Sequence, residues 1–533
     1  MAGNAVGLGN FLRFPAQAVQ NGGGAFIIPY LVSFVLMGIP LLWIEWAIGR
    51  HGGIYGHHST PGMLDVMGKS RWWKYVGTFG IFTNLTVAAY YCYLESWTLA
   101  YVWHSIIGTF GGKTSSEVAD FFNQYVGTTD GGLFNFPPEA LLFFLITLWL
   151  NIWILSRGLS KGVEIASKIG MPLLIIFGIF LAVRALTLDA GEQGAVNDAA
   201  IGLNFLWEPQ FHSLSNPKVW LAAAGQIFFT LSVGMGSIHC YAAYVRKNDD
   251  IALNAASAGW MNEFVEVLLG GSIVVPIAAA YLGLEWVQGN VGLAMGFRTM
   301  PTLFQNWGPF LAAIAGIAWF GLLFFAGITS SLAMGQPVMA FFQDHFRMRR
   351  ASSARVFGAL ILVLGLWTVF FYGYGAFTEF DDWSGTFSLV LFALLESVAF
   401  AWVFGIDRGW EEINRGADIK IPHLFKYVIK YVTPLFLLSV FIGSLIAPVG
   451  GDWNAAFAGL VAGNGWALDS GSIFGKILHV GFEDTRWFVG GQATKVFIVD
   501  MTRTLLILTF LAIALVIRIA WKRKDSQTAE NDS

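Results

Sequence analysis

The stretch Gly3-Asn-Ala-Val-Gly-Leu-Gly-Asn-Phe-Leu-Arg-Phe-Pro15 decides the fold of this chain. It places three glycines, two asparagines and an arginine where a membrane helix should run uninterrupted. In hydrocarbon every backbone N–H and C=O needs a partner, so an interruption is tolerated only where protein, water, an ion or a ligand supplies one. The stretch therefore predicts a broken membrane helix that forms part of a binding site.

The composition places the rest of the chain in lipid as well. Of its 533 residues 56% are hydrophobic and only 12% are charged, which is more apolar surface than one soluble core could bury. The net charge of −3 includes no basic excess that would neutralise nucleic-acid phosphates, so we expect no nucleic-acid partner. Cys92 and Cys240 lie in apolar segments without metal-site or disulfide partners, and we expect them to be packing residues.

Eleven further apolar stretches have roughly the length of about 20 residues that a helical membrane span requires. They cover residues 25–48, 76–107, 140–155, 169–186, 219–244, 252–282, 310–342, 356–371, 387–404, 432–446 and 505–519. We therefore predict an all-α polytopic membrane protein with twelve transmembrane helices in a single domain, residues 1–533.

The distribution of Lys and Arg predicts the orientation in the membrane. Most of the 31 basic residues, Arg50 among them, lie in alternate connections and in the C-terminal tail. Because cytoplasmic loops carry the positive excess, we expect a multi-pass protein of the cell's inner (plasma) membrane with a cytoplasmic C-terminus. The opposite loops, 108–137, 187–216 and 450–495, are longer, and the tryptophans of the last predict that it packs on the outer surface.

A second interruption lies in the sixth stretch, Gly225-Gln-Ile-Phe-Phe-Thr-Leu-Ser-Val-Gly-Met-Gly-Ser237. It follows the first interruption by five spans, an odd number, so the second group of five helices should be inverted relative to the first. We predict inverted repeats over 1–187 and 218–406, two additional helices within 424–521, and a site between the two breaks. Small residues in a single membrane helix are more often helix-packing contacts, but two breaks at corresponding positions favour the site.

Seven segments of the chain carry a family resemblance. They are Gly3 to Pro15, Asn21-Gly-Gly-Gly-Ala-Phe26, Trp43-Ile-Glu-Trp46, Tyr90-Tyr-Cys-Tyr-Leu-Glu-Ser-Trp97, Gln226-Ile-Phe-Phe-Thr-Leu-Ser232, Phe325-Ala-Gly-Ile-Thr-Ser-Ser331 and Trp410-Glu-Glu-Ile-Asn-Arg415. Together they resemble the neurotransmitter:sodium symporter family of sodium-dependent neurotransmitter and amino-acid transporters, in particular its bacterial leucine transporter. The resemblance implies a secondary symporter and not an enzyme, with unwound helices 1 and 6 and alternating access.

The resemblance also implies two sodium sites and no organic cofactor. One ion would be held by the Ala5 carbonyl and the side chains of Asn10, Thr230 and Asn262, with the substrate carboxylate completing the shell. The other would be held by the carbonyls of Gly3, Val6 and Ala326 and the hydroxyls of Thr329 and Ser330. Carbonyls, amides and hydroxyls suit this cation without a stack of buried carboxylates.

An amino acid would lie beside the first ion. Backbone N–H groups of Leu8 and Gly9 at a helix start, with the Tyr91 hydroxyl, would bind its carboxylate. The ammonium would meet the carbonyls of Ala5, Phe229 and Thr230 and the side chain of Ser232. The side-chain pocket would comprise Val87, Tyr91, Phe229, Ser232, Met235, Ser330 and Met334. Methionine fits irregular shapes, so we expect an apolar amino acid with tolerance among several, unless both methionines only fill gaps between helices.

Five acidic residues inside the spans are costly in lipid and therefore informative: Glu45, Glu95, Glu263, Glu266 and Glu396. The resemblance implies that Glu45 and Glu95 support the unwound backbone. Glu266 stands where chloride-dependent animal relatives carry a serine that helps bind the anion. A permanent carboxylate at this position predicts transport that is independent of chloride.

The resemblance further implies two gates. Arg13 and Asp381 match the outer gate, above an aromatic lid of Tyr91 and Phe229, although Arg13 could also be an ordinary snorkelling residue. Asp344 matches the acidic half of the inner gate. Its basic partner is missing, because family members begin well before the first motif; the first helix is expected to be N-terminally truncated, through either a misassigned start or a true truncation.

Two other classes of function stay open. A transport-deficient sensor or scaffold would bind sodium and amino acid without moving them. A membrane enzyme is disfavoured, because His104, His212 and His239 lack clustered partners in the sequence. The expected partners are a small amino acid and the lipid bilayer, with a homodimer as a possibility.

Overall fold

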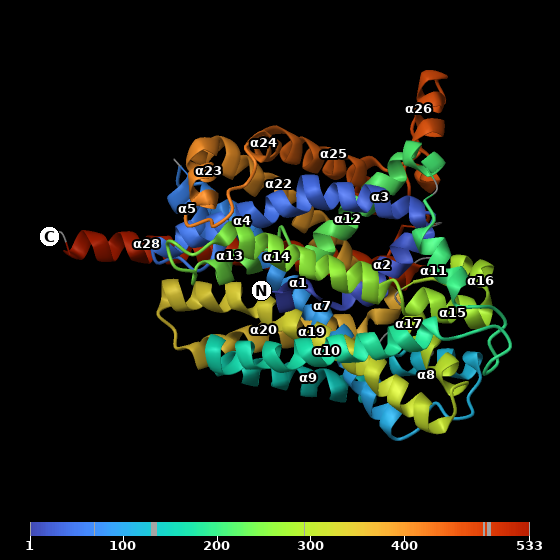
Figure 1. Ribbon diagram of the computed structural model, residues 1–533. Helices are drawn as coiled ribbons and strands as arrows, with labels where there is room; N and C mark the ends of the chain where they lie inside the picture. The colour runs from blue at the N-terminus through green and yellow to red at the C-terminus, as the bar shows by residue number, and fades with distance from the viewer. Residues whose placement is uncertain are drawn as a thin grey trace.

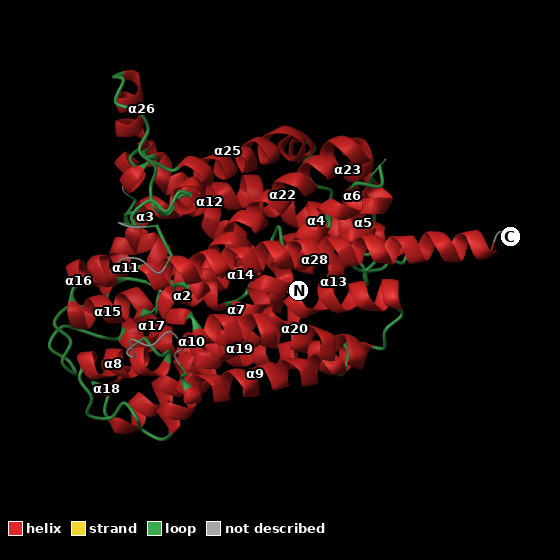
Figure 2. Cartoon of the chain, turned by 180° about the vertical axis from the view of Figure 1, so that it is seen from behind, coloured by secondary structure: helices red, strands yellow, loops and turns green. Residues whose placement is uncertain are grey.

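The computed structural model describes residues 2–68, 70–128, 136–209, 211–292, 294–482, 485–487 and 492–531. Every named element in these residues is a helix, and the one β-bridge joins Pro448 to Leu468. The all-α prediction is therefore confirmed. The helices lie side by side in one bundle (Figure 1), with the chain start in its middle in both views (Figure 2).

Within the described residues, nine helices are long and apolar enough to cross a membrane. They are Gly24–Ile54 (α3, η1 and α4), Pro138–Ser156 (α9), Leu159–Leu186 (η2 and α10), Ile251–Leu282 (α14, η4 and α15), Pro309–Phe346 (α19), Arg350–Phe370 (α20), Ala376–Asn414 (α21 to α23), Leu424–Ile446 (α24, η8 and α25) and Ala493–Arg523 in α28. The remaining three predicted spans are the two interrupted helices and α7 (Thr78–Ile106), which is buried along most of its length. The structure thus agrees with twelve helices.

The tenth span begins earlier than the sequence predicts. It starts at Ala376 and not near 387, because the polar run Asp381–Ser388 (η6) is helical and not a loop. The run forms a π-helix, and Ser384, Gly385 and Ser388 within it are buried. The small, buried residues of this π-helix face other helices and not lipid. The low hydropathy of the run is therefore explained by its position in the protein interior.

Both predicted interruptions are present. The first helix divides into α1 (Ala2–Ala5) and α2 (Leu8–Gln20), and the sixth into α12 (Pro217–Leu231) and α13 (Ser237–Ala242). Ser232 has φ 54°, and Gly234 and Gly236 have φ 74° and 92°. A Cβ on Gly234 would lie 2.4 Å from the Leu389 carbonyl oxygen. The break at residues 232–236 therefore requires glycine both for the backbone conformation and for the close approach of the tenth helix.

A buried ion pair ties the second helix to the tenth. Arg50, at the end of α4 (Ile39–Ile54), is fully buried, and its Nε lies 2.8 Å from Oε1 of Glu412 in α23 (Ile406–Asn414). Its Nη1 donates to the Asp249 carbonyl at 2.7 Å and to the Arg415 carbonyl at 3.1 Å. The sequence placed Arg50 in a cytoplasmic connection; the structure shows that it holds two membrane helices and a loop together.

The long outer loop is attached to the start of the tenth span. Lys476 of α27 (Ile473–Ile477) pairs with Asp382, and Arg503 of α28 (Ala493–Asn531) pairs with Glu379 at 2.7 Å. The indole of Trp466 donates to the Ile446 carbonyl at 2.9 Å. By contrast α26 (Trp453–Val461) projects away from the bundle (Figure 1). The loop therefore packs as expected only in part, and residues 483–484 and 488–491 lie outside the described chain.

Candidate functional site

The break in the first helix is held open by side chains. The Gly7 N–H donates to Oδ1 of Asn10 at 2.7 Å, and the Leu8 N–H donates to the Tyr91 hydroxyl at 3.0 Å. A Cβ on Gly7 would lie 2.9 Å from that hydroxyl and 3.0 Å from the Ser330 hydroxyl oxygen. Glycine at this position therefore lets α7 and α19 approach the unwound backbone.

The break in the sixth helix is held in a similar way from two other helices. The Gly234 N–H donates to Oε1 of Glu45 at 2.5 Å, and the amide of Asn84 donates to the Met235 carbonyl. Glu45 is fully buried in the second helix, and Asn84 is fully buried in α7. Polar groups that lost their helical partners thus find new partners on neighbouring spans, as hydrocarbon surroundings require.

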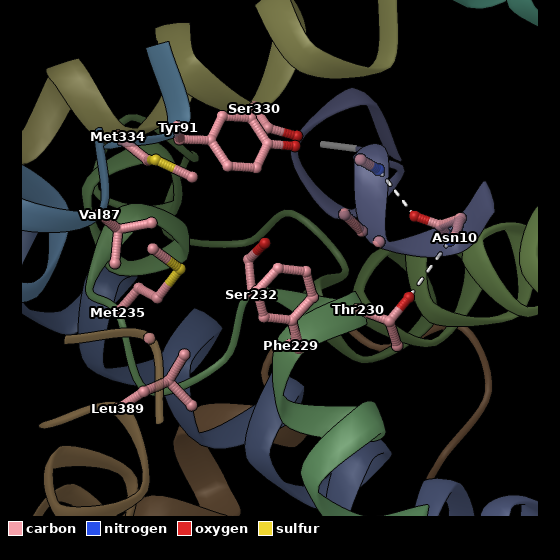
Figure 3. Close-up of a pocket in the computed structure, with 14 residues that line it drawn as sticks. Asn10, Val87, Tyr91, Phe229, Thr230, Ser232, Met235, Ser330, Met334 and Leu389 are labelled. Atoms are coloured by element: carbon pink, nitrogen blue, oxygen red, sulfur yellow. Dashed lines mark hydrogen bonds between the residues drawn. The ribbon is translucent and has the colours of Figure 1, made fainter. Parts of the chain in front are cut away.

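A small cavity of about 20 Å³ lies between the two breaks. Its lining combines backbone and side chains of five spans: Ala5, Gly7, Gly9, Asn10, Val87, Tyr91, Phe229, Thr230, Ser232, Met235, Ser330, Met334, Gly385 and Leu389. Figure 3 shows Val87, Met235, Met334 and Leu389 on one side, and Asn10 with Thr230 on the other. The cavity thus has an apolar end and a polar end.

Most of the residues expected in the amino-acid pocket line this cavity. Leu8 is the exception and lines the neighbouring outer cavity instead. The additions are Asn10, which was expected only at the sodium, and Gly7, Gly385 and Leu389, which were expected at no site. The small and polar residues before position 387 could have indicated Gly385, but the predicted tenth span began after them.

The side chains expected at the first sodium lie within hydrogen-bonding distance of one another. The Asn10 amide nitrogen is 2.9 Å from Oδ1 of Asn262 and 3.2 Å from Oγ1 of Thr230. The Asn262 amide nitrogen is 2.9 Å from the same threonine oxygen. All three residues are buried. The amide and hydroxyl oxygens of this group, together with the Ala5 carbonyl oxygen at the cavity wall, are ligands that a hard monovalent cation prefers.

The oxygens expected at the second sodium also come from facing segments, residues 3–6 at the first break and α19. Ser330 Oγ lies 3.5 Å from the Val6 carbonyl oxygen, and Thr329 Oγ1 lies 3.3 Å from the Ala326 carbonyl oxygen. A Cβ on Gly3 would lie 3.5 Å from the Thr329 Cβ. Hydroxyls and carbonyls from two helices fit a sodium ion that would hold these helices together.

The predicted contact of the outer gate is not made. In the described part of the chain Arg13 and Asp381 form no ion pair: Asp381 Oδ1 accepts from the Tyr90 hydroxyl at 2.6 Å, and the Arg13 guanidinium lies 4.2 Å from the centre of the Phe229 ring. Both charged residues line the same outer cavity of about 290 Å³. Tyr91 and Phe229 line this cavity and the small one below it, so they lie between the two.

Asp344 at the expected inner gate has a partner after all. Its carboxylate accepts from the His58 backbone N–H at 2.7 Å and lies 3.1 Å from Nδ1 of the same residue. The His58 ring stacks on Tyr244 at 4.7 Å between centroids. His58 reaches Asp344 from the connection after the second helix. The arginine that the resemblance implies as the basic half of this gate stays a prediction. Next to it, Gly3, Thr329 and Tyr244 line an inner cavity of about 570 Å³.

The buried acids have several roles. Glu95 lies 3.2 and 3.3 Å from the amide nitrogen of Asn151 in α9, so its described partner is a neighbouring side chain and not the unwound backbone that we expected. Glu266 accepts from Gln226 at 2.8 Å and from the Thr230 hydroxyl. Glu263 is buried beside Asn262. The carboxylate of Glu266 thus reaches the first sodium group through Thr230.

Two of the histidines that lack clustered partners in the sequence have acidic partners in the structure. His104 lies 2.8 Å from Glu139, and His239 lies between Glu45 and Glu396. These partners come from other helices, so no local pattern could reveal them. The side chain of His212 lies outside the described residues.

Comparisons with known proteins point in one direction. The sequence profile of the Sodium:neurotransmitter symporter family matches residues 1–114 and 108–475. An uncharacterised sodium-dependent transporter of Methanocaldococcus jannaschii is 31% identical over 452 residues, which is 82% of this chain and 86% of that protein. The sodium-dependent nutrient amino acid transporter 1 of Drosophila grimshawi is 26% identical over 517 residues, 87% of this chain and 78% of the relative.

A solved structure shows the same fold. The crystal structure of MhsT in complex with L-phenylalanine superposes with a TM-score of 0.72, at 28% sequence identity, over 83% of this chain and 96% of that one.

Proposed function

The chain belongs to the sodium:neurotransmitter symporter family, and on this premise we propose that it imports an apolar amino acid by sodium-coupled alternating access. Members of this family are multi-pass, sodium-dependent transporters and not enzymes. The observation that carries the proposal is the division of the central cavity into a polar end at Asn10 and Thr230 and an apolar end at Val87, Met235 and Met334. The likeness to a protein that binds L-phenylalanine supports the same substrate class.

The polar end suits the two charges of an amino acid. Because the Tyr91 hydroxyl accepts from the Leu8 N–H, its own hydrogen is left to donate to a carboxylate. The helix start at Leu8 and Gly9 adds a favourable dipole for the same group. On the opposite side, the Ser232 side chain and the carbonyls of Ala5, Phe229 and Thr230 would accept from the ammonium group.

Two sodium ions would couple transport to the gradient. Asn10, Thr230, Asn262 and the Ala5 carbonyl would hold the first ion next to the substrate carboxylate. The carbonyls of Gly3, Val6 and Ala326 with Thr329 and Ser330 would hold the second. With about 2.3 kcal/mol per charge at 100 mV and about 1.4 kcal/mol per tenfold sodium gradient, two ions would supply about 7 kcal/mol.

Access would alternate through the two larger cavities. From the outside, movement of Arg13 toward Asp381 would close the outer cavity above Tyr91 and Phe229. From the inside, the His58–Asp344 contact and the inner cavity beside Thr329 would provide the second path. The two inverted repeats are proposed to cover residues 1–187 and 218–406. The C-terminus is proposed to be cytoplasmic, and a homodimer is a possible assembly.

Uptake measurements test the function. Purified protein in proteoliposomes with an inward sodium gradient should accumulate a labelled apolar amino acid, and phenylalanine, leucine, methionine and tryptophan should compete with each other. Uptake should disappear when potassium replaces sodium. Sodium-dependent binding without any uptake would support the transport-deficient sensor instead, and uptake of glycine alone would contradict the apolar pocket.

Chloride replacement tests the role of Glu266. We expect equal uptake in chloride and in gluconate, because the Glu266 carboxylate already supplies a fixed negative charge beside Thr230. The variant Glu266→Ser should lose most uptake in gluconate and recover it in chloride, since an anion must then take the place of the carboxylate. Loss of wild-type uptake in gluconate would refute chloride independence.

A further inference from the structure

A histidine lies between two buried glutamates beside the break in the sixth helix. His239 of α13 faces Glu45 of α4 with Nδ1, at 3.4 Å from Oε2, and Glu396 of α22 (Leu389–Val398) with Nε2, at 3.3 Å from Oε2. The three side chains are 1%, 0% and 0% exposed. They belong to the second, sixth and tenth spans, and the proposed sodium and substrate groups do not include them.

The polar atoms of this cluster are unsatisfied in the structure. Among the described residues, both ring nitrogens of His239, Oε2 of Glu45 and both carboxylate oxygens of Glu396 have no hydrogen-bond partner. The distances of 3.3 and 3.4 Å are just beyond the range of about 2.7–3.2 Å for an N–H···O bond. Buried, unpaired charges are strongly unfavourable, and such groups become neutral by binding a proton, so this cluster is a candidate for proton binding.

The three side chains converge on one point. A ring nitrogen of His239 and one oxygen of each carboxylate lie within 4.8 Å of one another. Groups this close can share a proton, and the same ligand types could also hold a metal ion. A proton satisfies the cluster with the chain's own groups alone, and a metal analysis distinguishes the two.

No other charged side chain is described as a partner of His239. Phe392 of the tenth span packs against its ring, and Asn84 of α7, which contacts Met235 nearby, is neutral. Asp344 of α19 is bound to His58 on the inner side. The protonation of the cluster therefore depends on its own three members.

The cluster is connected to the unwound segment through Glu45. Its Oε1 accepts from the Gly234 N–H, while its Oε2 faces His239. Loss of the proton would leave two like charges on carboxylates that have oxygens within 4.8 Å of each other, and like charges at this distance repel. Repulsion would move Glu45 and so weaken the bond that holds Gly234.

We propose that Glu45, His239 and Glu396 form a proton-binding site, separate from the sodium and substrate sites, whose protonation holds the unwound segment 232–236 in place. Because the site is fully buried, a proton enters or leaves only when the second, sixth and tenth spans move apart. Proton exchange is thereby linked to the conformational change of the sixth helix, so the conformation of the segment depends on pH.

Hydrogen exchange tests this directly, without sodium or amino acid. With purified protein in nanodiscs, amides of peptides covering 232–240 should exchange about tenfold faster or more at about pH 9 than at about pH 6, after correction for intrinsic base catalysis. Raising the pH removes the proton, so protection falls in that direction. In His239→Gln, which cannot carry the proton, this excess should disappear. The matched control His104→Gln should retain it.

Two further measurements keep the proposal testable if His239→Gln does not fold. Infrared difference spectra of the wild-type protein between the same pH values should show loss of a protonated carboxyl band or of an imidazolium band, and Glu396→Gln should alter that change. Elemental analysis for zinc should find no stoichiometric metal. An unchanged pH profile in His239→Gln, a flat wild-type profile, or stoichiometric zinc lost on substitution of His239 would each overturn the proton site. None of these outcomes depends on transport.

Discussion

Asn10→Ala is expected to abolish sodium-dependent binding and uptake of amino acid. The Asn10 side chain accepts from the Gly7 N–H and donates toward Asn262 and Thr230, all inside the buried polar group. Leaving one buried polar group unpaired costs about 1–3 kcal/mol, and the substitution affects three such groups. A total of about 3 kcal/mol or more corresponds to a loss of about 100-fold or more in the apparent sodium affinity.

Asn254→Ala is the matched control. Asn254 lies in the same helix as Asn262, α14 (Ile251–Glu263), but it is exposed, and its side chain donates to the Asp250 carbonyl one turn earlier. Scintillation proximity binding with a labelled amino acid across a sodium titration measures both variants. The Asn254→Ala titration should match that of the wild-type protein. An Asn10→Ala variant that is folded by gel filtration and has the wild-type sodium titration would refute the first sodium site.

Arg50→Met is expected to lower the free energy of unfolding by about 3 kcal/mol, the low end of the range for breaking a buried ion pair, because the buried Glu412 carboxylate then keeps, among the described residues, only the half-exposed Arg415 at 2.5 Å as a partner. Glu412 is 2% exposed, and its backbone carbonyl also accepts a hydrogen bond from Arg50. Its carboxylate therefore cannot turn to water without movement of α23. Denaturant unfolding in detergent, followed by tryptophan fluorescence, measures the change. The second, sixth and tenth spans should loosen together, because Arg50 also binds the Asp249 and Arg415 carbonyls.

The same helix provides a control for this prediction. Asp407 in α23 pairs with Lys426 at 2.6 Å, but its side chain is 82% exposed. Lys426→Met should change the unfolding free energy by about 1 kcal/mol or less, as for other surface pairs. The double variant Arg50→Met with Glu412→Met should recover much of the lost stability, since neither charge is then left unpaired. Equal losses for the single Arg50 and Lys426 variants would contradict the buried pair.

Much of the fold follows from local patterns in the sequence. The apolar stretches are long enough to require membrane helices, and the glycines and asparagines between residues 3 and 10 cannot continue a helix in lipid without other partners. The same holds for Ser232, Gly234 and Gly236. The tenth span was the exception, because its polar start at Asp381 has the composition of a loop, yet it faces the protein interior as a π-helix.

The candidate site was less completely predictable. The residues of the first, third, sixth and eighth spans follow from motifs, and the structure brings them around one cavity. Gly385 and Leu389 could be assigned only once the tenth helix was seen against the break in the sixth. The contact between Arg13 and Asp381 depends on the conformation adopted, and here both gate residues line the same cavity of about 290 Å³.

The sequence by itself determined that this chain is a membrane protein with two broken helices, because the hydrocarbon environment allows so few ways to satisfy the backbone. Only the tertiary structure decided which side chains satisfy the freed groups. Glu45 and His239 are nearly two hundred residues apart, and Arg50 and Glu412 are still further apart, so their pairing depends on helix packing and on no local pattern. Contacts between distant helices therefore decide the inner partner of Asp344, the buried ion pair and the proposed proton site.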